Sequence, residues 1–270
     1  MTLLHRIYIK LYYKFWDTIL PKKLIRFNSQ LSQKRNLFLY FDYEREFGGY
    51  NTNISDSDID MILKELGQYS YKTTWFTVGK LFRKYPKSIE SIVNEGHEIG
   101  SHTYSHIPPS RTPKKGLAKD FLMFSSSKNK NISTKGFHSP TGQWSFSLFK
   151  LLKENGFIYD VYGSSKKRKS RSHFLYYGLN KRALRLLTVG DDWPLFNKNL
   201  PSDEICSYFV ELTIKVKKGE VAGIGFHPWV LFSDVNILEG FKSFLKQLHV
   251  IDDIVVNPAH YYADSILNKY

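Results

Sequence analysis

The sequence predicts an α/β fold in which seven or eight parallel strands form a distorted (β/α) barrel. Three observations support this prediction. Short runs rich in β-branched and aromatic residues alternate with longer runs of helical spacing along most of the chain. The 270 residues are enough for one large core. Polar residues recur where the apolar runs end, and a parallel barrel gathers its functional residues at the carboxyl ends of its strands.

The predicted strands are short apolar runs bounded by turn-forming residues. They are Leu37–Asp42, Thr73–Val78, His97–His102, Lys135–His138, Ile158–Val161, Leu186–Val189, Val221–His227 and Ile251–Val256. The interval Gly163–Arg185 contains no clear strand and is predicted to be the one insertion.

The predicted helices fall between these strands and show apolar side chains at helical spacing. They are Ser55–Tyr69, Lys80–Asn94, Thr112–Ser127, Ser145–Asn155, Ser202–Lys217, Asn236–Leu248 and Pro258–Asn268. Ser55 and Asp58 suit the N-cap and first turn of the first helix, and glycines at positions 96, 156 and 219 end three others.

Residues 1–34 form a basic amphipathic segment that precedes the predicted barrel of residues 35–270. Its apolar side chains recur at helical spacing and are Leu4, Ile7, Tyr8, Leu11, Tyr12, Phe15 and Ile19. This stripe either lies in a membrane interface or packs against the barrel, and the sequence leaves both open. Lys10 and Lys14 interrupt the apolar run, which argues against a cleaved signal peptide or a spanning helix. We therefore expect a cytoplasmic protein, with attachment to the inner face of the membrane as an extension.

The net charge of +14 indicates an anionic neighbour such as a phospholipid surface, a diphosphate-linked lipid or nucleic acid. No nucleic-acid-binding motif accompanies the charge, so we expect no specific nucleic-acid partner. Cys206 is the only cysteine, which excludes an internal disulfide, and its helical apolar surroundings predict a buried, inert thiol.

Five segments at predicted strand ends carry side chains suited to metal-dependent amide hydrolysis. They are Phe41–Glu44, His102–His106, Phe137–Gly142, Asp191–Trp193 and Phe226–Pro228. Two imidazoles four residues apart can reach one divalent ion, and a carboxylate completes a set that leaves positions open for water. Each segment alone is compatible with ordinary surface polarity. Their joint placement at strand ends predicts one site.

The content and order of these segments resemble the polysaccharide deacetylase family, the NodB homology domain of carbohydrate esterase type, over roughly Asn36–Val256. Several segments carry the resemblance, and they are Tyr40–Asp42, Glu95–Ser101, His102 with His106, Gly156–Asp160, Asp192–Trp193 and Ile224–His227. The resemblance implies a metal-dependent hydrolase of non-peptide carbon–nitrogen bonds. Its substrate would be an N-acyl amino sugar, in the first place N-acetyl, within a glycan or a lipid-linked saccharide.

The resemblance also implies a role for each polar side chain. Glu44, His102 and His106 would hold a divalent ion, Zn²⁺ in the first place and Co²⁺, Ni²⁺ or Mn²⁺ otherwise, which polarises the acyl oxygen and acidifies water. The implied acid–base residues are Asp42 as base, His227 as acid and Asp192 as the partner that orients His227. The implied substrate-lining residues are His138, Pro140, Thr141, Trp144 and Trp193, with the backbone N–H of Thr141 as oxyanion donor and the two tryptophans as walls for the sugar.

Three features depart from the family pattern. Tyr43 stands where the usual signature has a metal-binding Asp, so the ligand is assigned to Glu44, since residues two apart on a strand face the same side. His138 and Thr141 replace the Arg and Tyr of the third motif, and a neutral imidazole cannot pair bidentately with Asp42. The predicted insertion would reshape the rim of the site.

Two other functions are compatible with these departures. One is a deformylase or amidase that acts on another carbon–nitrogen amide. The other is a non-catalytic barrel that binds carbohydrate, against which the retention of Asp42, His227 and both metal-type histidines argues.

Overall fold

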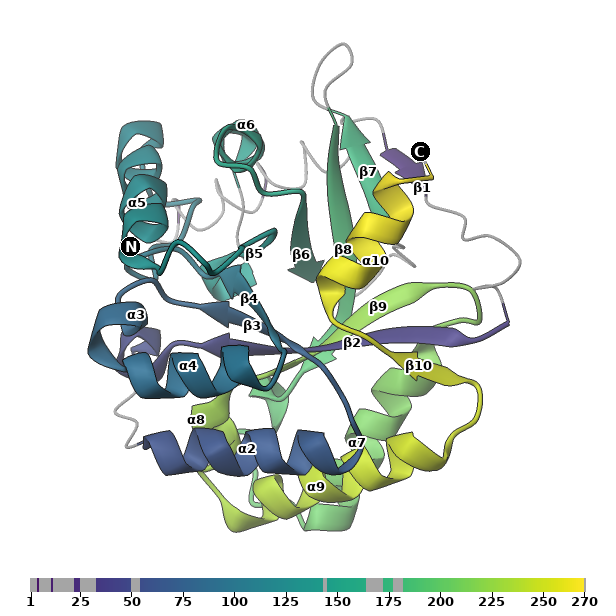
Figure 1. The fold of residues 1–270 in the computed structure, drawn as a ribbon. Helices are drawn as coiled ribbons and strands as arrows, with labels where there is room; N and C mark the ends of the chain where they lie inside the picture. Colours follow the sequence, from purple (N-terminus) through teal and green to yellow (C-terminus); the bar gives the residue numbers. More distant parts are fainter. Residues whose placement is uncertain are drawn as a thin grey trace.

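Seven parallel strands close into a ring in the computed structural model of the chain (Figure 1). In ring order they are β2 (Arg35–Tyr43), β3 (Thr74–Thr77), β4 (Glu98–Ser101), β5 (Gly136–His138), β6 (Tyr159–Gly163), β8 (Arg182–Asp191) and β9 (Val221–Phe226). β9 pairs with β2 and so completes the barrel that the sequence predicts. The structure describes residues 4, 11, 22–24, 33–49, 54–142, 145–163, 172–176 and 182–269.

Three further described strands lie outside the ring. β10 (Ile254–Val256) runs parallel to the first residues of β2. β7 (His173–Tyr176) pairs antiparallel with β8, and β1 (Lys22–Leu24) pairs antiparallel with β7. The prediction that Gly163–Arg185 contains no strand is therefore wrong. An antiparallel pair requires no crossover helix, so the alternation of strands and helices that reveals a parallel strand does not mark β7.

The predicted helices surround the ring. They are α2 (Asp56–Gln68), α3 (Leu81–Lys84), α4 (Pro86–Asn94), α5 (Lys114–Ser127), α6 (Phe146–Glu154), α7 (Ser202–Lys215), α9 (Val235–Val250) and α10 (Ala259–Leu267), with the short α8 (Pro228–Leu231) added after β9. The single helix predicted over Lys80–Asn94 is wrong, because Pro86 keeps Tyr85 out of the helical region (φ −134°, ψ 58°) and divides α3 from α4. The predicted cap is confirmed: Ser55 and Asp58 form a reciprocal capping box at α2.

Alternation along each strand builds two apolar layers. On β2, Phe38 and Tyr40 belong to the cluster inside the barrel, whereas Leu39 and Phe41 belong to the cluster between barrel and helices. In Figure 1, α2, α7 and α9 lie below the strands, and α10 lies against the opposite side.

Helix α10 closes the amino end of the barrel. Its Ala259 N–H donates to Thr74 Oγ1 at 2.8 Å, and its His260 N–H donates to Glu98 Oε2 at 3.0 Å. Thr74 and Glu98 are the first residues of β3 and β4. The carboxyl ends of the strands are therefore the end left for a site.

The amino-terminal segment lies mostly outside the described residues. Of residues 1–34 the structure describes Leu4, Leu11, β1 and positions 33–34, and the side chains of Leu4 and Leu11 are exposed. The boundary at residue 34 and the choice between membrane and barrel packing remain predictions. Among the described residues, no helix combines the length and the apolar character needed to cross a membrane.

Candidate metal and acid–base site

The predicted polar side chains gather at the carboxyl end of the barrel. Asp42 is the penultimate residue of β2, and Glu44 follows that strand directly. The others end or follow neighbouring strands: His102 after β4, His138 as the last residue of β5, Asp192 after β8 and His227 after β9. All six are buried or nearly so, which places their charges where water screens them weakly.

Glu44, His102 and His106 have the spacing of a metal-ligand set. Glu44 Oε1 lies 3.5 Å from His102 Nε2 and 3.5 Å from His106 Nε2. Ligand atoms about 2.1 Å from a tetrahedral Zn²⁺ stand about 3.4 Å apart, so one ion fits among the three atoms. These contacts are long for hydrogen bonds, and His106 Nε2 is buried with no hydrogen-bond partner among the described residues.

The tautomer of His102 suits a metal ligand. Its Nδ1–H donates to the backbone carbonyl of His138 at 2.8 Å, which leaves the lone pair of Nε2 directed toward Glu44. Burial lowers the pKa of His102, so its ring stays neutral at neutral pH. Burial alone would raise the pKa of Glu44, but contacts with His102 and His106 outweigh burial and hold that pKa below its ordinary range.

Two other groups of side chains are close enough to suggest an ion, but each has a feature that disfavours one. In the group of Asp42, His102 and His138, the Nδ1 of His138 is only 2.8 Å from Asp42 Oδ1, a direct hydrogen bond. In the group of Asp42, Glu44 and His227, the histidine is held protonated by its carboxylate neighbours and would repel a cation. Of the three groups, Glu44, His102 and His106 are therefore the candidate ligands for an ion.

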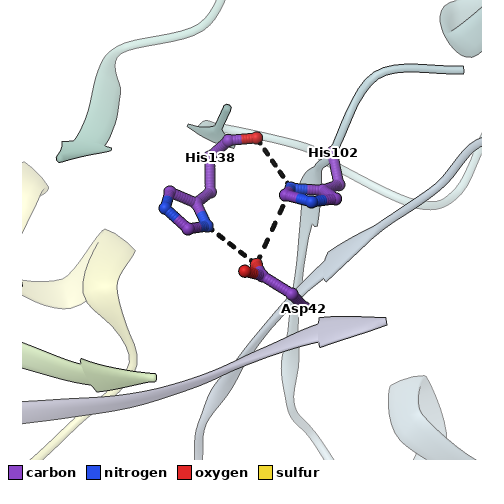
Figure 2. A group of neighbouring side chains, drawn as sticks. All are labelled: Asp42, His102 and His138. Carbon is purple, nitrogen blue, oxygen red and sulfur yellow. Dashed lines mark hydrogen bonds and ion pairs between the residues drawn. The ribbon is translucent and has the colours of Figure 1, made fainter. Parts of the chain in front are cut away.

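His138 forms hydrogen bonds both with Asp42 and with His102 of the candidate metal-ligand set. Figure 2 shows its ring directed at Asp42 and its carbonyl directed at His102. One hydrogen bond thus replaces the bidentate pairing that an Arg would give. Burial raises the pKa of Asp42, but the imidazoles of His138 and His102 outweigh burial and leave the pKa below its ordinary value. Asp42 is therefore ionised at neutral pH and able to accept a proton.

His227 is held by Asp192 and faces the other carboxylates. Its Nδ1 lies 2.6 Å from Asp192 Oδ1, and its backbone N–H donates to Asp192 Oδ2 at 2.7 Å. Its Nε2 points into the site, 3.6 Å from Asp42 Oδ2 and 3.8 Å from Glu44 Oε1. Burial lowers the pKa of His227, but Asp192 and then Asp42 outweigh burial and raise it to about 10. His227 is thus a proton donor beside an ionised acceptor.

Burial also raises the pKa of Asp192, to about 6. The raised pKa of Asp192 and the raised pKa of His227 both describe one proton, which the two side chains share. Because His227 faces three carboxylates, we place that proton on the imidazole.

The loop after β2 fixes the Glu44 carboxylate. Arg45 adopts a left-handed backbone (φ 47°), and its guanidinium donates to Tyr43 Oη at 2.7 Å and to Asp56 Oδ1 at 2.5 Å. In the short helix η1 (Arg45–Gly48), Gly48 lies against Glu44 so closely that a Cβ there would overlap Oε2. The loop therefore leaves the carboxylate little freedom to move away from the two histidines.

Of the predicted substrate-lining residues, the structure describes His138, Pro140, Thr141 and Trp193. Pro140 is buried and Thr141 is exposed in the short helix η2 (Pro140–Gly142), where Thr141 has a left-handed backbone (φ 60°). Trp193 is 44% exposed, and its ring centroid lies 6.4 Å from that of His227. Trp144 lies outside the described residues.

Several residues that shape the site had no role in the sequence-based prediction. Gly48 contacts Glu44, and Asp120 of α5 accepts hydrogen bonds from the loop between the two metal-type histidines. One feature of the sequence could have revealed Asp120. It lies on the apolar face of its helix, beside Leu117, Phe121 and Phe124. An acidic residue in a row of buried side chains needs a polar partner.

Comparison with known proteins finds similar sequences and similar folds. A family model described as "Polysaccharide deacetylase" matches residues 32–159, a stretch that contains Asp42, Glu44, His102, His106 and His138. A peptidoglycan deacetylase of Helicobacter pylori is 34% identical over 152 residues, which make up 54% of this chain and 46% of that protein. The chain thus matches about half the length of this curated relative.

Solved structures share the fold at low sequence identity. A protein from Mycobacterium smegmatis, assigned as a polysaccharide deacetylase, superposes with a TM-score of 0.78 at 19% identity and covers 92% of this chain and 96% of that one. The PuuE allantoinase superposes with a TM-score of 0.67 at 16% identity and covers 85% of this chain and 89% of that one. At these identities the comparison concerns the fold, because one fold can host several chemistries.

Proposed function

Because the chain belongs to the polysaccharide deacetylase family, we propose that it hydrolyses the N-acetyl group of an amino sugar within a glycan or a lipid-linked saccharide. A single observation carries this proposal. An ionised carboxylate, Asp42, and a protonated imidazole, His227, flank a set of three side chains spaced for one divalent ion. Amide hydrolysis needs these three components, because the nucleophilic water must lose a proton and the amine leaves poorly without gaining one.

Glu44, His102 and His106 would hold the ion, for which Zn²⁺ is the first choice because two imidazoles and one carboxylate suit it. When bound, such an ion polarises the acyl oxygen and lowers the pKa of water at the site.

Asp42 takes the proton of water as the new carbon–oxygen bond forms. Oδ1 is occupied by His138, which leaves Oδ2, the oxygen nearer His227, to accept that proton. His227 Nε2–H then donates to the nitrogen as the carbon–nitrogen bond breaks. One proton is accepted and one is given, and exchange with solvent restores both groups.

Substrate selection would depend on the rim of the site. The exposed Trp193 offers an apolar face beside His227, where a sugar ring or an acetyl methyl could pack. The backbone N–H of Thr141 is the proposed oxyanion donor. Trp144 is a second proposed wall.

The relatives support a glycan of the cell envelope as the substrate. The protein should therefore be purified, loaded with Zn²⁺ and assayed for acetate release. The test panel is a peptidoglycan glycan strand, chitooligosaccharides, a nucleotide-linked N-acetylamino sugar and a non-saccharide amide. Acetate from a saccharide supports the proposal, whereas turnover of the non-saccharide amide alone would favour an amidase. The shared fold with an allantoinase makes that second function worth including.

The proposal also includes where the protein works in the cell. The charge of +14 and the basic amphipathic pattern of residues 1–34 support work at an anionic cytoplasmic membrane surface. Flotation of the full chain with anionic vesicles at low salt, lost at high salt, would support this location, and equal flotation with neutral vesicles would count against it.

A further inference from the structure

The loop between the two metal-type histidines has an unfavourable backbone. Thr103 and His106 both lie in the left-handed region, with φ of 63° and 59°. A Cβ makes this region sterically poor, and a β-branched side chain such as that of Thr103 makes it poorer. The loop therefore needs outside contacts to keep the shape that directs both imidazoles at Glu44.

Asp120 supplies one of these contacts from another element. Its carboxylate accepts the backbone N–H of Tyr104 at 2.6 Å and that of Ser105 at 3.1 Å. Successive backbone N–H groups of this kind form a concave site for an anion, and here a side chain from α5 fills it. Among the described residues, no salt bridge reaches Asp120, which is only 4% exposed. The two loop amides, together with the Ser105 side chain and the charge of Lys80, offset the burial of this carboxyl group.

The opposite side of the same loop is held by backbone contacts. The amides of Gly79 and Lys80 donate to the carbonyls of Thr103 and Tyr104 at 2.9 and 3.1 Å. Gly79 permits this approach, because a Cβ there would lie 2.8 Å from the Tyr104 ring and 3.0 Å from Tyr104 Cα. The residues that follow β3 thus hold the carbonyl groups of the loop, and α5 holds its amide groups. The loop is therefore held from two directions.

We propose that Asp120 is a positioning residue for the metal site, which holds the loop of residues 103–106 in the left-handed form that brings His106 Nε2 to Glu44. The inference rests on the proposed metal site of Glu44, His102 and His106. Asp120 does not touch the ion or the substrate. It acts through the backbone of Tyr104 and Ser105.

Asp120→Asn is the informative variant, because it keeps the shape of the side chain. An amide has one acceptor oxygen and turns its NH₂ group toward the second loop amide, so one of the two hydrogen bonds is replaced by a repulsive contact. The matched control is Glu98→Gln. Glu98 is also a buried carboxyl group that accepts several hydrogen bonds, but it lies at the amino end of β4, opposite the site.

The experiment uses the full chain and Zn²⁺ alone. Affinity is measured by competition with a chelator, site geometry by the absorption spectrum of the Co²⁺ form, and stability by thermal unfolding. We expect Asp120→Asn to bind Zn²⁺ about 10–100-fold more weakly, as loss of support behind a metal ligand does, and to change the Co²⁺ spectrum. Glu98→Gln should lower the unfolding temperature but keep both the wild-type affinity and spectrum.

The outcomes separate this inference from the proposed function. Wild-type affinity and spectrum in Asp120→Asn would overturn the role of Asp120 and leave the metal site standing. An equal loss of Zn²⁺ affinity in Glu98→Gln would show that reduced stability alone weakens Zn²⁺ binding. This result would also overturn the role of Asp120. A wild-type protein that binds no Zn²⁺ would overturn the metal site, and the inference with it.

Discussion

Gly48→Ala should weaken metal binding through a direct effect on Glu44. Gly48 is outside the left-handed region, so alanine is compatible with its backbone. Its new Cβ would lie 3.1 Å from Glu44 Cδ and would overlap Oε2. Oε2 would have to retreat by more than about 1 Å to reach a normal separation of about 3.5 Å.

The atom near the two imidazoles is Oε1, which belongs to the same planar carboxylate and would move with Oε2. Such a displacement is large for a metal ligand, because ligand distances vary by only about 0.2 Å. We expect the affinity for Zn²⁺, measured by chelator competition, to fall about 10–100-fold, the range found when contacts behind a ligand are changed. Turnover should fall in parallel at limiting Zn²⁺ and recover in part at excess Zn²⁺.

Gly49→Ala is the matched control in the same loop. Gly49 has a φ of 85° and nothing within 4 Å of its would-be Cβ, so alanine strains the turn without approaching Glu44. It should cost about 1–2 kcal/mol of stability and leave Zn²⁺ affinity unchanged. If Gly48→Ala binds Zn²⁺ like the wild type, or if both variants lose affinity equally, Glu44 is not positioned as we describe.

Three further variants test the acid–base assignments. Asp42→Asn should keep one equivalent of metal but lose about 10²–10⁴-fold in turnover, measured as acetate release, because an amide cannot accept the proton of water. His227→Ala should slow hydrolysis of an amide by a similar factor but leave an activated ester, whose leaving group needs no proton, far less affected; equal losses on both substrates would indicate a structural role. Asp192→Asn removes the main charge that raises the pKa of His227. NMR titration of the metal-free variant should therefore give a His227 pKa below the value of about 10 expected for the wild type. An unchanged titration would contradict the pairing of His227 with Asp192.

Much of the barrel is visible in the sequence because its strands are separated by helices. A change from the spacing of strands to the spacing of helices marks most of the strands in the ring. Polar residues at the ends of β2, β4, β5, β8 and β9 mark the site. β7 left no such sign, since an antiparallel neighbour follows it without a helix. The division of α3 from α4 had a visible cause in Pro86, whose effect on Tyr85 the helical spacing concealed.

The candidate site was predictable as a set of side chains but not as an arrangement. Residue types and strand ends predict one site, and the family resemblance assigns Glu44, His102 and His106 as its ion ligands. Which imidazole atoms face the ion depends on hydrogen bonds to backbone atoms, and these depend on the folded loops. The same holds for Asp120 and Gly48, whose importance comes from contacts with segments distant in the sequence or from a missing side chain.

The central claim is that one divalent ion, held by Glu44, His102 and His106, is required for removal of an acetyl group. The most direct measurement is a titration of metal-stripped protein with Zn²⁺, with acetate release from an N-acetylated oligosaccharide followed at each point, in the wild type and in His106→Ala. We predict that activity rises to a plateau at one equivalent in the wild type and that His106→Ala neither binds Zn²⁺ tightly nor regains activity. Full acetate release by the metal-stripped protein, or unchanged Zn²⁺ binding in His106→Ala, would contradict the account.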